Sequence, residues 1–185
     1  IPVSSSAKEK AFKKKDKKGA ATSSPVSKEY LNMAKSWLND ENSDKYILLA
    51  EGTNIRAFSQ YYTNELTMMK QSLKIVSAGI EIGEVKGKDL IPNHALAMCI
   101  SLLCREAFAI EEISYEQAIT YLRKEAITLP ATAPRGYVLL TYRHIPLGFV
   151  KNIGNRANNL YPQEWRIRSG YLPENIRILS EDVTD

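Results

Sequence analysis

The side chains best suited to binding chemistry lie close together near the end of the chain. Two short apolar runs, 136–142 and 147–151, are followed by a stretch from 152 to 162 with almost no apolar content. Guanidinium groups hold phosphate oxygens in a planar fork, and tyrosine rings stack on bases. We therefore predict a surface for a nucleic acid, formed by Arg135, Tyr142, Arg143, Lys151, Arg156, Asn159, Tyr161, Arg166 and Arg168.

The distribution of charge supports this interpretation. The formal net charge is only +4, but residues 134–179 contain six Arg and one Lys against Glu164 and Glu174. Residues 28–133 contain 11 basic and 14 acidic residues, so the positive charge is separated from an acidic body. Such a basic block is typical of proteins that bind nucleic acids.

Two other interpretations of the basic surface remain open. It could be a solubilising surface with local ion pairs, although only two acidic residues lie nearby in the sequence. The chain could also be a protein-interaction module, which predicts RNA binding that is weak and insensitive to salt, and an exposed apolar patch within 28–106. A free-standing enzyme would require a pocket with a perturbed acid–base pair.

The sequence offers no constellation for catalysis. His94 opens a predicted helix and His144 lies in a predicted surface turn, so neither is placed beside a nucleophile. No glycine-rich loop links a strand to a helix, and a helix-end role explains the pair Glu111 and Glu112. We expect no catalytic residue and no cofactor in this chain.

The two cysteines, Cys99 and Cys104, lie five positions apart in an apolar stretch, and we expect two buried thiols. No further Cys or His stands at ligand spacing, so we predict no metal site. No run approaches the roughly 20 apolar residues of a membrane span, and nothing indicates an oxidising compartment. These observations predict a cytoplasmic protein without a membrane partner, which we expect to be a monomer.

Periodicity and turn residues predict alternating helices and strands. Ser27 and Ser114 are expected to cap helices, and Gly87-Lys88 is expected to form a two-residue hairpin turn. Helices are predicted from 28, over 60–71, over 94–105 and from 115, and strands over 46–50, 54–58, 73–86, 136–142, 147–151 and 164–168.

The run 136–142 carries apolar residues on both faces, which predicts a strand of a small closed barrel covered on both sides. Gly148, inside the partner strand, is expected to leave room for another backbone. In 164–168, Trp165 and Ile167 alternate with Arg166 and Arg168, which predicts one core face and one guanidinium face.

Two ordered motifs within about 45–170 resemble the C-terminal region of the Sun-type rRNA cytosine-C5 methyltransferases, in particular the RsmF-like branch. The upstream motif consists of Ala78-Gly79, Ile82-Gly83-Glu84 and Pro92-Asn93-His94-Ala95-Leu96-Ala97. The downstream motif consists of Gly136-Tyr137-Val138-Leu139, Pro146-Leu147-Gly148-Phe149, Lys151, Gly154-Asn155-Arg156 and Asn159-Leu160-Tyr161-Pro162. The chain departs from the pattern at Val150, Asn155 and Asn158.

The resemblance implies a PUA-like RNA-binding module in a larger enzyme. The parent would use S-adenosylmethionine to methylate carbon 5 of a cytosine in small-subunit rRNA. Its cofactor and paired cysteines would lie in a catalytic domain that precedes this region, so Cys99 and Cys104 are not catalytic candidates. The chain begins without Met and is expected to be a piece of a longer polypeptide, inactive in methyl transfer by itself.

Taken together, these observations predict an α+β chain with an arm and two parts. Residues 1–27 form a Lys-rich linker or arm, with or without RNA contact. Residues 28–106 form a small α/β subdomain, and 107–185 form a PUA-like barrel with a packed helix and an acidic tail. The expected partners are rRNA or the small ribosomal subunit and the protein's own catalytic domain. The expected function is to position that domain on rRNA.

Overall fold

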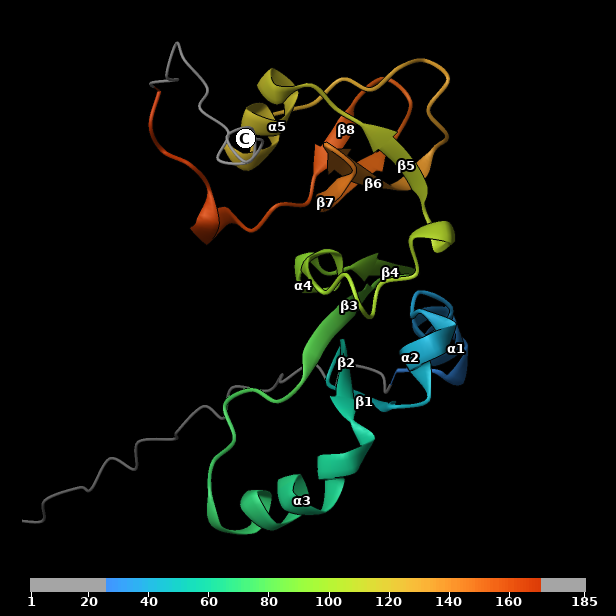
Figure 1. Ribbon diagram of the computed structural model, residues 1–185, viewed down its shortest axis with the longest axis vertical. Helices are drawn as coiled ribbons and strands as arrows, with labels where there is room; N and C mark the ends of the chain where they lie inside the picture. The colour runs from blue at the N-terminus through green and yellow to red at the C-terminus, as the bar shows by residue number, and fades with distance from the viewer. Residues whose placement is uncertain (1–25, 171–185) are drawn as a thin grey trace, which may run out of the picture.

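The computed structural model describes residues 26–170, so the predictions for most of the Lys-rich arm and for the acidic tail lie outside the described residues. The described chain contains two four-stranded sheets with several helices, which confirms the predicted α+β class. Figure 1 shows the two sheets one above the other along the long axis, with α3 at the end far from the second sheet.

The first sheet is an antiparallel meander in the order β1-β2-β3-β4. Its turns contain Gly52 and Gly87, both with φ near +60°, a conformation that glycine adopts without steric cost. The elements of this part are α1 (Lys28–Ser36), α2 (Asp40–Ser43), β1 (Tyr46–Glu51), β2 (Asn54–Ser59), η1 (Gln60–Tyr62), α3 (Thr63–Ser72), β3 (Ile80–Lys86), β4 (Asp89–Pro92) and α4 (His94–Met98).

The second sheet has the order β5-β6-β7-β8. Strand β5 pairs with β6 in parallel, and α5 lies in the crossover between them; the other pairs are antiparallel. Ile127 adds an isolated bridge to Ala157 of β8. The elements of this part are η2 (Arg105–Ala107), β5 (Ala109–Glu112), α5 (Tyr115–Leu122), β6 (Gly136–Tyr142), β7 (Ile145–Asn152), β8 (Ala157–Asn159) and η3 (Gln163–Trp165).

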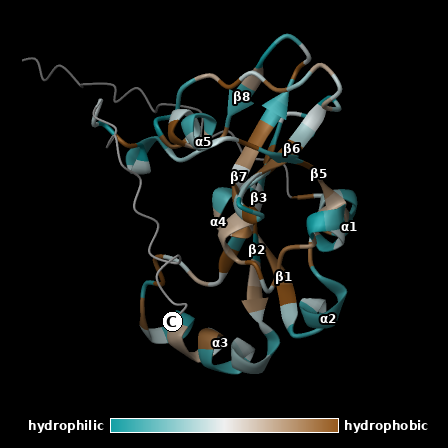
Figure 2. Ribbon diagram, turned by 45° about the horizontal axis from the view of Figure 1, so that its top comes forward, coloured by the Kyte–Doolittle hydropathy of each residue, from teal (hydrophilic) through white to brown (hydrophobic). Residues whose placement is uncertain are grey.

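The hairpin of β6 and β7 is shared between two hydrophobic clusters. Leu139 and Phe149 belong to the cluster that includes the first sheet, with Trp37 and Phe108 near them. The neighbouring residues on the other face, among them Val150, join the cluster beneath α5. The residues 138–141 are therefore all buried, which confirms that this strand is covered on both sides. Figure 2 shows the apolar segments concentrated on the strands, with α2 largely hydrophilic.

Gly148 accommodates side chains rather than a backbone, so the sequence prediction for it was wrong. A Cβ at this position would lie 2.1 Å from the Tyr121 hydroxyl and 2.8 Å from His94 Nδ1. The buried Tyr121 hydroxyl donates a hydrogen bond to the Phe149 carbonyl at 3.2 Å. The missing side chain thus lets α5 and α4 approach β7 closely.

Helix starts were predicted better than element lengths. Ser114 forms the full capping box with Gln117, whereas Ser27 precedes α1 without a side-chain cap bond. The predicted strand 73–86 begins only at Ile80, and the predicted helix from His94 ends at Met98. The polar stretch 39–44, for which no element was predicted, contains the short helix α2.

The C-terminal predictions need larger corrections. Residues 164–168 do not form a strand: η3 ends at Trp165, and irregular chain follows to Gly170. Trp165 and Ile167 are 58% and 38% exposed, so the predicted core face is also wrong. Strands β5 and β8 were not predicted.

The cysteines are half-buried and lie outside α4, contrary to the expected buried thiols. None of the described helices is long and apolar enough to span a bilayer.

Candidate nucleic-acid interface

The tip of the β6–β7 hairpin presents Arg143 and His144 to solvent. Tyr142 pairs with Ile145, so these two residues form a two-residue turn. Their φ angles are 50° and 62°, and positive φ at both positions is the geometry of a type I′ turn. Neither is Gly or Asn, the residues that this turn favours. A strained turn that displays a cation is a candidate for a functional contact.

Glu112 at the end of β5 holds this turn in place. Its carboxylate accepts hydrogen bonds from the Thr141 hydroxyl at 2.5 Å and from the His144 backbone N–H at 3.2 Å. The Thr141 bond, with smaller contributions from the backbone N–H groups of His144 and Arg143, lowers the pKa of Glu112. Since β5 pairs with β6 in parallel, the strand delivers this carboxylate directly to the turn.

Aromatic rings support the same tip. The Arg143 guanidinium lies 5.9 Å from the centre of the Tyr142 ring, and Tyr115 packs on Tyr142 with ring centres 6.3 Å apart. Guanidinium and aromatic planes of this kind are the groups on which unpaired RNA bases stack. The tip could therefore offer a cation and two ring edges to one nucleotide.

Arg135 and Arg156 lie at the opposite end of the hairpin. Gly136 pairs with Asn152, and a Cβ on Gly154 would lie 3.0 Å from the Arg135 guanidinium. The buried Asn152 amide donates to the carbonyls of residues 133 and 134, and its oxygen accepts from the Gly154 N–H. These bonds fix the loop beneath the two arginines, both of which are exposed.

Lys151 lies elsewhere, on the face of β7 toward the first sheet. It forms a salt bridge with Asp89 of β4, and its ammonium lies 5.3 Å from the centre of the Tyr137 ring. The hydrogen bond to Asp89, followed by the interaction with Tyr137, raises the pKa of Lys151. Lys151 is thus paired with a carboxylate of the first sheet.

Asn159 and Tyr161 are likewise engaged, near the C-terminal end of α5. The Asn159 amide donates to the carbonyls of Tyr121 and Glu125, at 2.8 and 2.9 Å, and its oxygen accepts from the Tyr161 N–H. The half-buried Tyr161 ring packs edge-on against Tyr121 and His94. Both residues fasten the chain after β8 to α5 and α4.

His94 lies at the start of α4, as the sequence predicted, and it is buried, which lowers its pKa. Its ring contacts Tyr161 and Trp165 edge-on, so it packs between the two parts of the molecule.

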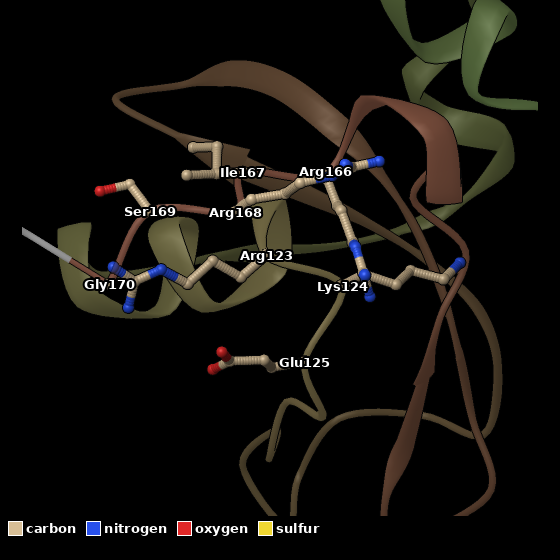
Figure 3. Close-up of a pocket in the computed structure, with 8 residues that line it drawn as sticks. All are labelled: Arg123, Lys124, Glu125, Arg166, Ile167, Arg168, Ser169 and Gly170. Carbon is tan, nitrogen blue, oxygen red and sulfur yellow. The ribbon is translucent and has the colours of Figure 1, made fainter.

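Arg166 and Arg168 cross the end of α5 in the irregular segment after η3. The Ile167 N–H donates to the Leu122 carbonyl at 2.9 Å, which places the two arginines beside Arg123 and Lys124 (Figure 3). Neither Arg123 nor Lys124 was predicted from the sequence. The signal was available, because a basic pair directly follows the helix predicted from Ser114.

The structure therefore distributes the nine predicted residues among four places rather than one surface. These are the hairpin tip, the opposite end of the hairpin, the face toward β4 and the end of α5. The two hairpin ends are separated by more than about 20 Å, since β6 has seven residues at about 3.4 Å each. Within 26–170, five exposed arginines form no salt bridge: Arg135, Arg143, Arg156, Arg166 and Arg168.

Residues 109–167 match the family described as "Methyltransferase RsmF PUA domain". The chain is also similar to curated proteins named "Ribosomal RNA small subunit methyltransferase F". The one from Salmonella newport (strain SL254) is 32% identical over 109 residues, which are 58% of this chain and 22% of the relative. Those from Salmonella heidelberg (strain SL476) and Salmonella typhi give the same identity and coverage. The chain thus spans about a fifth of these relatives, and the resemblance to the RsmF branch is confirmed.

Proposed function

From the premise that this chain carries a PUA domain of the RsmF family over residues 109–167, we propose that it is the RNA-binding region of a small-subunit rRNA methyltransferase. Its role would be to position the catalytic domain of the parent protein on rRNA. The parent would transfer a methyl group from S-adenosylmethionine to carbon 5 of a cytosine, and would act in the cytoplasm.

One observation carries the RNA-binding part of this proposal. Five arginines on and around the second sheet are exposed and, among the described residues, have no carboxylate within salt-bridge distance. Three carboxylates of the body are already paired: Glu51 and Glu81 with Arg56, and Asp89 with Lys151. A polyanion could bind the arginines without first displacing an internal partner.

The test is the salt dependence of binding to a structured fragment of small-subunit rRNA. Each neutralised phosphate contributes about 0.7–0.9 to the slope of log affinity against log salt concentration. If all five arginines contact phosphates, the slope should be on the order of −4. A slope near zero would overturn the proposal. The double variant Lys86→Gln, Lys88→Gln, which removes two exposed charges from the first sheet, is the matched control.

Positioning is tested separately in the parent enzyme. Removal of residues 109–170 should raise KM for rRNA while leaving kcat on a short substrate RNA almost unchanged, because the chemistry would belong to another domain. The present chain alone should incorporate no labelled methyl group from S-adenosylmethionine into RNA. Incorporation by this chain would contradict the division of roles.

A second candidate function has an observation of its own. Helix α3 and its flanks expose large apolar side chains at the end of the molecule far from the second sheet (Figure 1). Val76, Met68 and Leu73 are 92%, 69% and 61% exposed. Such a cluster favours a protein interface, with the catalytic domain or a ribosomal protein as the partner.

This second function predicts an association that high salt does not weaken. Co-sedimentation with small ribosomal subunits should then persist at about 0.5 M KCl, where exposed charge interactions are screened over about 4–5 Å. The double variant Met68→Ser, Val76→Ser should abolish it. If sedimentation instead disappears with salt and ignores this variant, the interface is electrostatic and α3 is not the docking surface.

A further inference from the structure

A basic pocket lies where the segment after η3 crosses the C-terminal end of α5. The pocket has a volume of about 440 Å³. Figure 3 shows Arg123 and Lys124 reaching from the end of the helix, and Arg166 and Arg168 from the crossing segment. The lining is completed by Glu125, Ile167, Ser169 and Gly170.

Hydrogen bonds hold together the two segments that carry the four cations. The Ile167 N–H bonds the Leu122 carbonyl, so the two arginines on either side of Ile167 are fixed over the helix end. Lys124 has φ 64°, the left-handed conformation common just after a helix, and its ammonium donates to the Tyr161 carbonyl. The pocket is therefore built by the fold and is not a chance grouping of long side chains.

The electrostatic balance of the pocket is strongly positive. The lining contains four cationic side chains and one carboxylate, Glu125. None of the four cations forms a salt bridge with a described residue. Glu164 lies close enough to raise the pKa of Lys124, but the larger effect is burial, which lowers it. Burial thus disfavours the Lys124 charge, and a bound anion would relieve this penalty.

Arg123 gives an independent indication of a missing ligand. Its Nε and Nη2 atoms are buried and have no hydrogen-bond partner among the described residues. An unpartnered buried donor is costly, and such groups commonly mark a place where an ion or a water completes the structure. The negative end of the α5 dipole also favours cations here, which is the alternative, purely structural reason for Arg123.

The lining limits the chemistry of the ligand. Ile167 is its one apolar side chain, so the pocket offers no surface on which to bury a nucleobase. Guanidinium forks match phosphate oxygens, and a space of several hundred Å³ exceeds the needs of a single small ion. The pocket fits the sugar–phosphate backbone and would not discriminate between sequences.

We propose that Arg123, Lys124, Arg166 and Arg168 form a binding site for backbone phosphates of RNA, separate from the hairpin tip. The RNA backbone as the source of these phosphates rests on the proposed function. The site adds Arg123 and Lys124 to the residues predicted from the sequence.

The first measurement compares RNA binding by the chain and by Arg166→Gln, Arg168→Gln from about 0.05 to 0.3 M KCl. The RNAs are an rRNA helix and a helix of unrelated sequence. Both affinities should fall by the same factor, and the slope should decrease by about 1.5, since two phosphate contacts are lost. The control Lys86→Gln, Lys88→Gln should retain the original slope. An unchanged slope in Arg166→Gln, Arg168→Gln, with RNA still bound, would overturn the pocket and leave the proposed function standing.

The second measurement does not depend on RNA. Pyrophosphate is titrated into the 15N-labelled chain, and the Nε–Hε signals of Arg123, Arg166 and Arg168 are followed by NMR. These signals should shift together. Arg123→Gln should weaken pyrophosphate binding at least several-fold. Its thermal midpoint should fall by no more than the loss of one cation at a helix end explains. No shift in these signals means that the cations serve only the helix and that the site is wrong. Pyrophosphate binding here without any RNA binding would instead refute the proposed function.

Discussion

The strained tip of the β6–β7 hairpin allows binding to be separated from stability. We consider the replacement of Arg143-His144 by Asn-Gly, the pair that a type I′ turn prefers. The left-handed conformation costs an ordinary residue roughly 1–2 kcal/mol, and two such residues stand in this turn. If the Arg143 and His144 side chains serve binding, this role explains why the chain carries the strained pair instead of Asn-Gly.

The expected gain in stability follows from these terms. Relief at two positions is partly offset by about 0.5–1 kcal/mol for the greater freedom of glycine in the unfolded chain. The ion pair of His144 with Glu112 contributes little, because it spans 3.8 Å and the His144 side chain is 91% exposed. The backbone N–H at position 144 still reaches Glu112. A net gain of about 1–3 kcal/mol should raise the thermal midpoint by about 3–9 °C.

The same variant should bind RNA less well. Loss of one phosphate contact at Arg143 should decrease the salt slope by about 0.7–0.9. The single variant His144→Gly is the internal control, because it should stabilise the turn and keep the cation. Lys88→Gln, at the tip of the β3–β4 hairpin, controls for the loss of one exposed charge.

Two results would refute this reasoning in different ways. A lower thermal midpoint in the Asn-Gly variant would mean that the turn is not strained, or that the lost side chains stabilise the fold more than the strain costs. A higher midpoint with unaltered RNA affinity and slope would mean that the tip is not part of the RNA-binding surface.

Three further outcomes follow from the structure. The Thr141 and backbone hydrogen bonds hold the pKa of Glu112 below its usual 4.5. The stabilising effect of Glu112 is therefore present above that pH and is lost as pH falls through the lowered pKa. Glu112→Gln should reduce this loss of stability at acid pH, measured as urea midpoints from about pH 3 to 7. Gly148→Ala would force a Cβ into the buried phenol hydroxyl and should destabilise the chain by about 3 kcal/mol or more, against about 1 kcal/mol for Gly52→Ala, where the space is open. Lys151→Gln should change the RNA salt slope less than loss of an unpaired arginine, because RNA must compete with Asp89 for this ammonium; an equal change would show that the salt bridge opens readily.

The sequence was informative at several places where a local rule decided the structure. The capping box at Ser114 and the turn at Gly87 depend on neighbouring residues, and both occur as predicted. The apolar run 136–142 correctly indicated a strand covered on both faces. Each of these features can be identified within a window of a few residues.

The errors arise where distant contacts decide. Strand β5 is only four residues long and is stabilised by parallel pairing with β6, which lies across the α5 crossover. Strand β8 lies in a polar stretch and pairs with β7 through backbone groups, so its side chains carry no strand pattern. Segment 164–168 alternates like a strand, yet the bond from Ile167 to Leu122 replaces a sheet partner.

The prediction of a single binding surface failed to account for the path of the chain. Residues 143 and 156 are near in sequence, but β7 carries the chain from one end of the sheet to the other between them. Conversely, Arg123 and Arg166 are far apart in sequence and meet at one pocket because α5 and the last segment cross. Spacing along the chain can nominate cations, whereas their grouping depends on the topology.

The acidic body explains why the arginines are free to bind a polyanion. A carboxylate close in space to a cation usually pairs with it, and here three carboxylates of the body already have partners. Glu112 accepts from the hairpin turn, and Asp89 binds Lys151 on the face toward the first sheet. Glu81 accepts from both Arg56 and Asn93. The fold thus directs these negative charges to internal donors, and the attraction that remains at the surface of the second sheet is for phosphate.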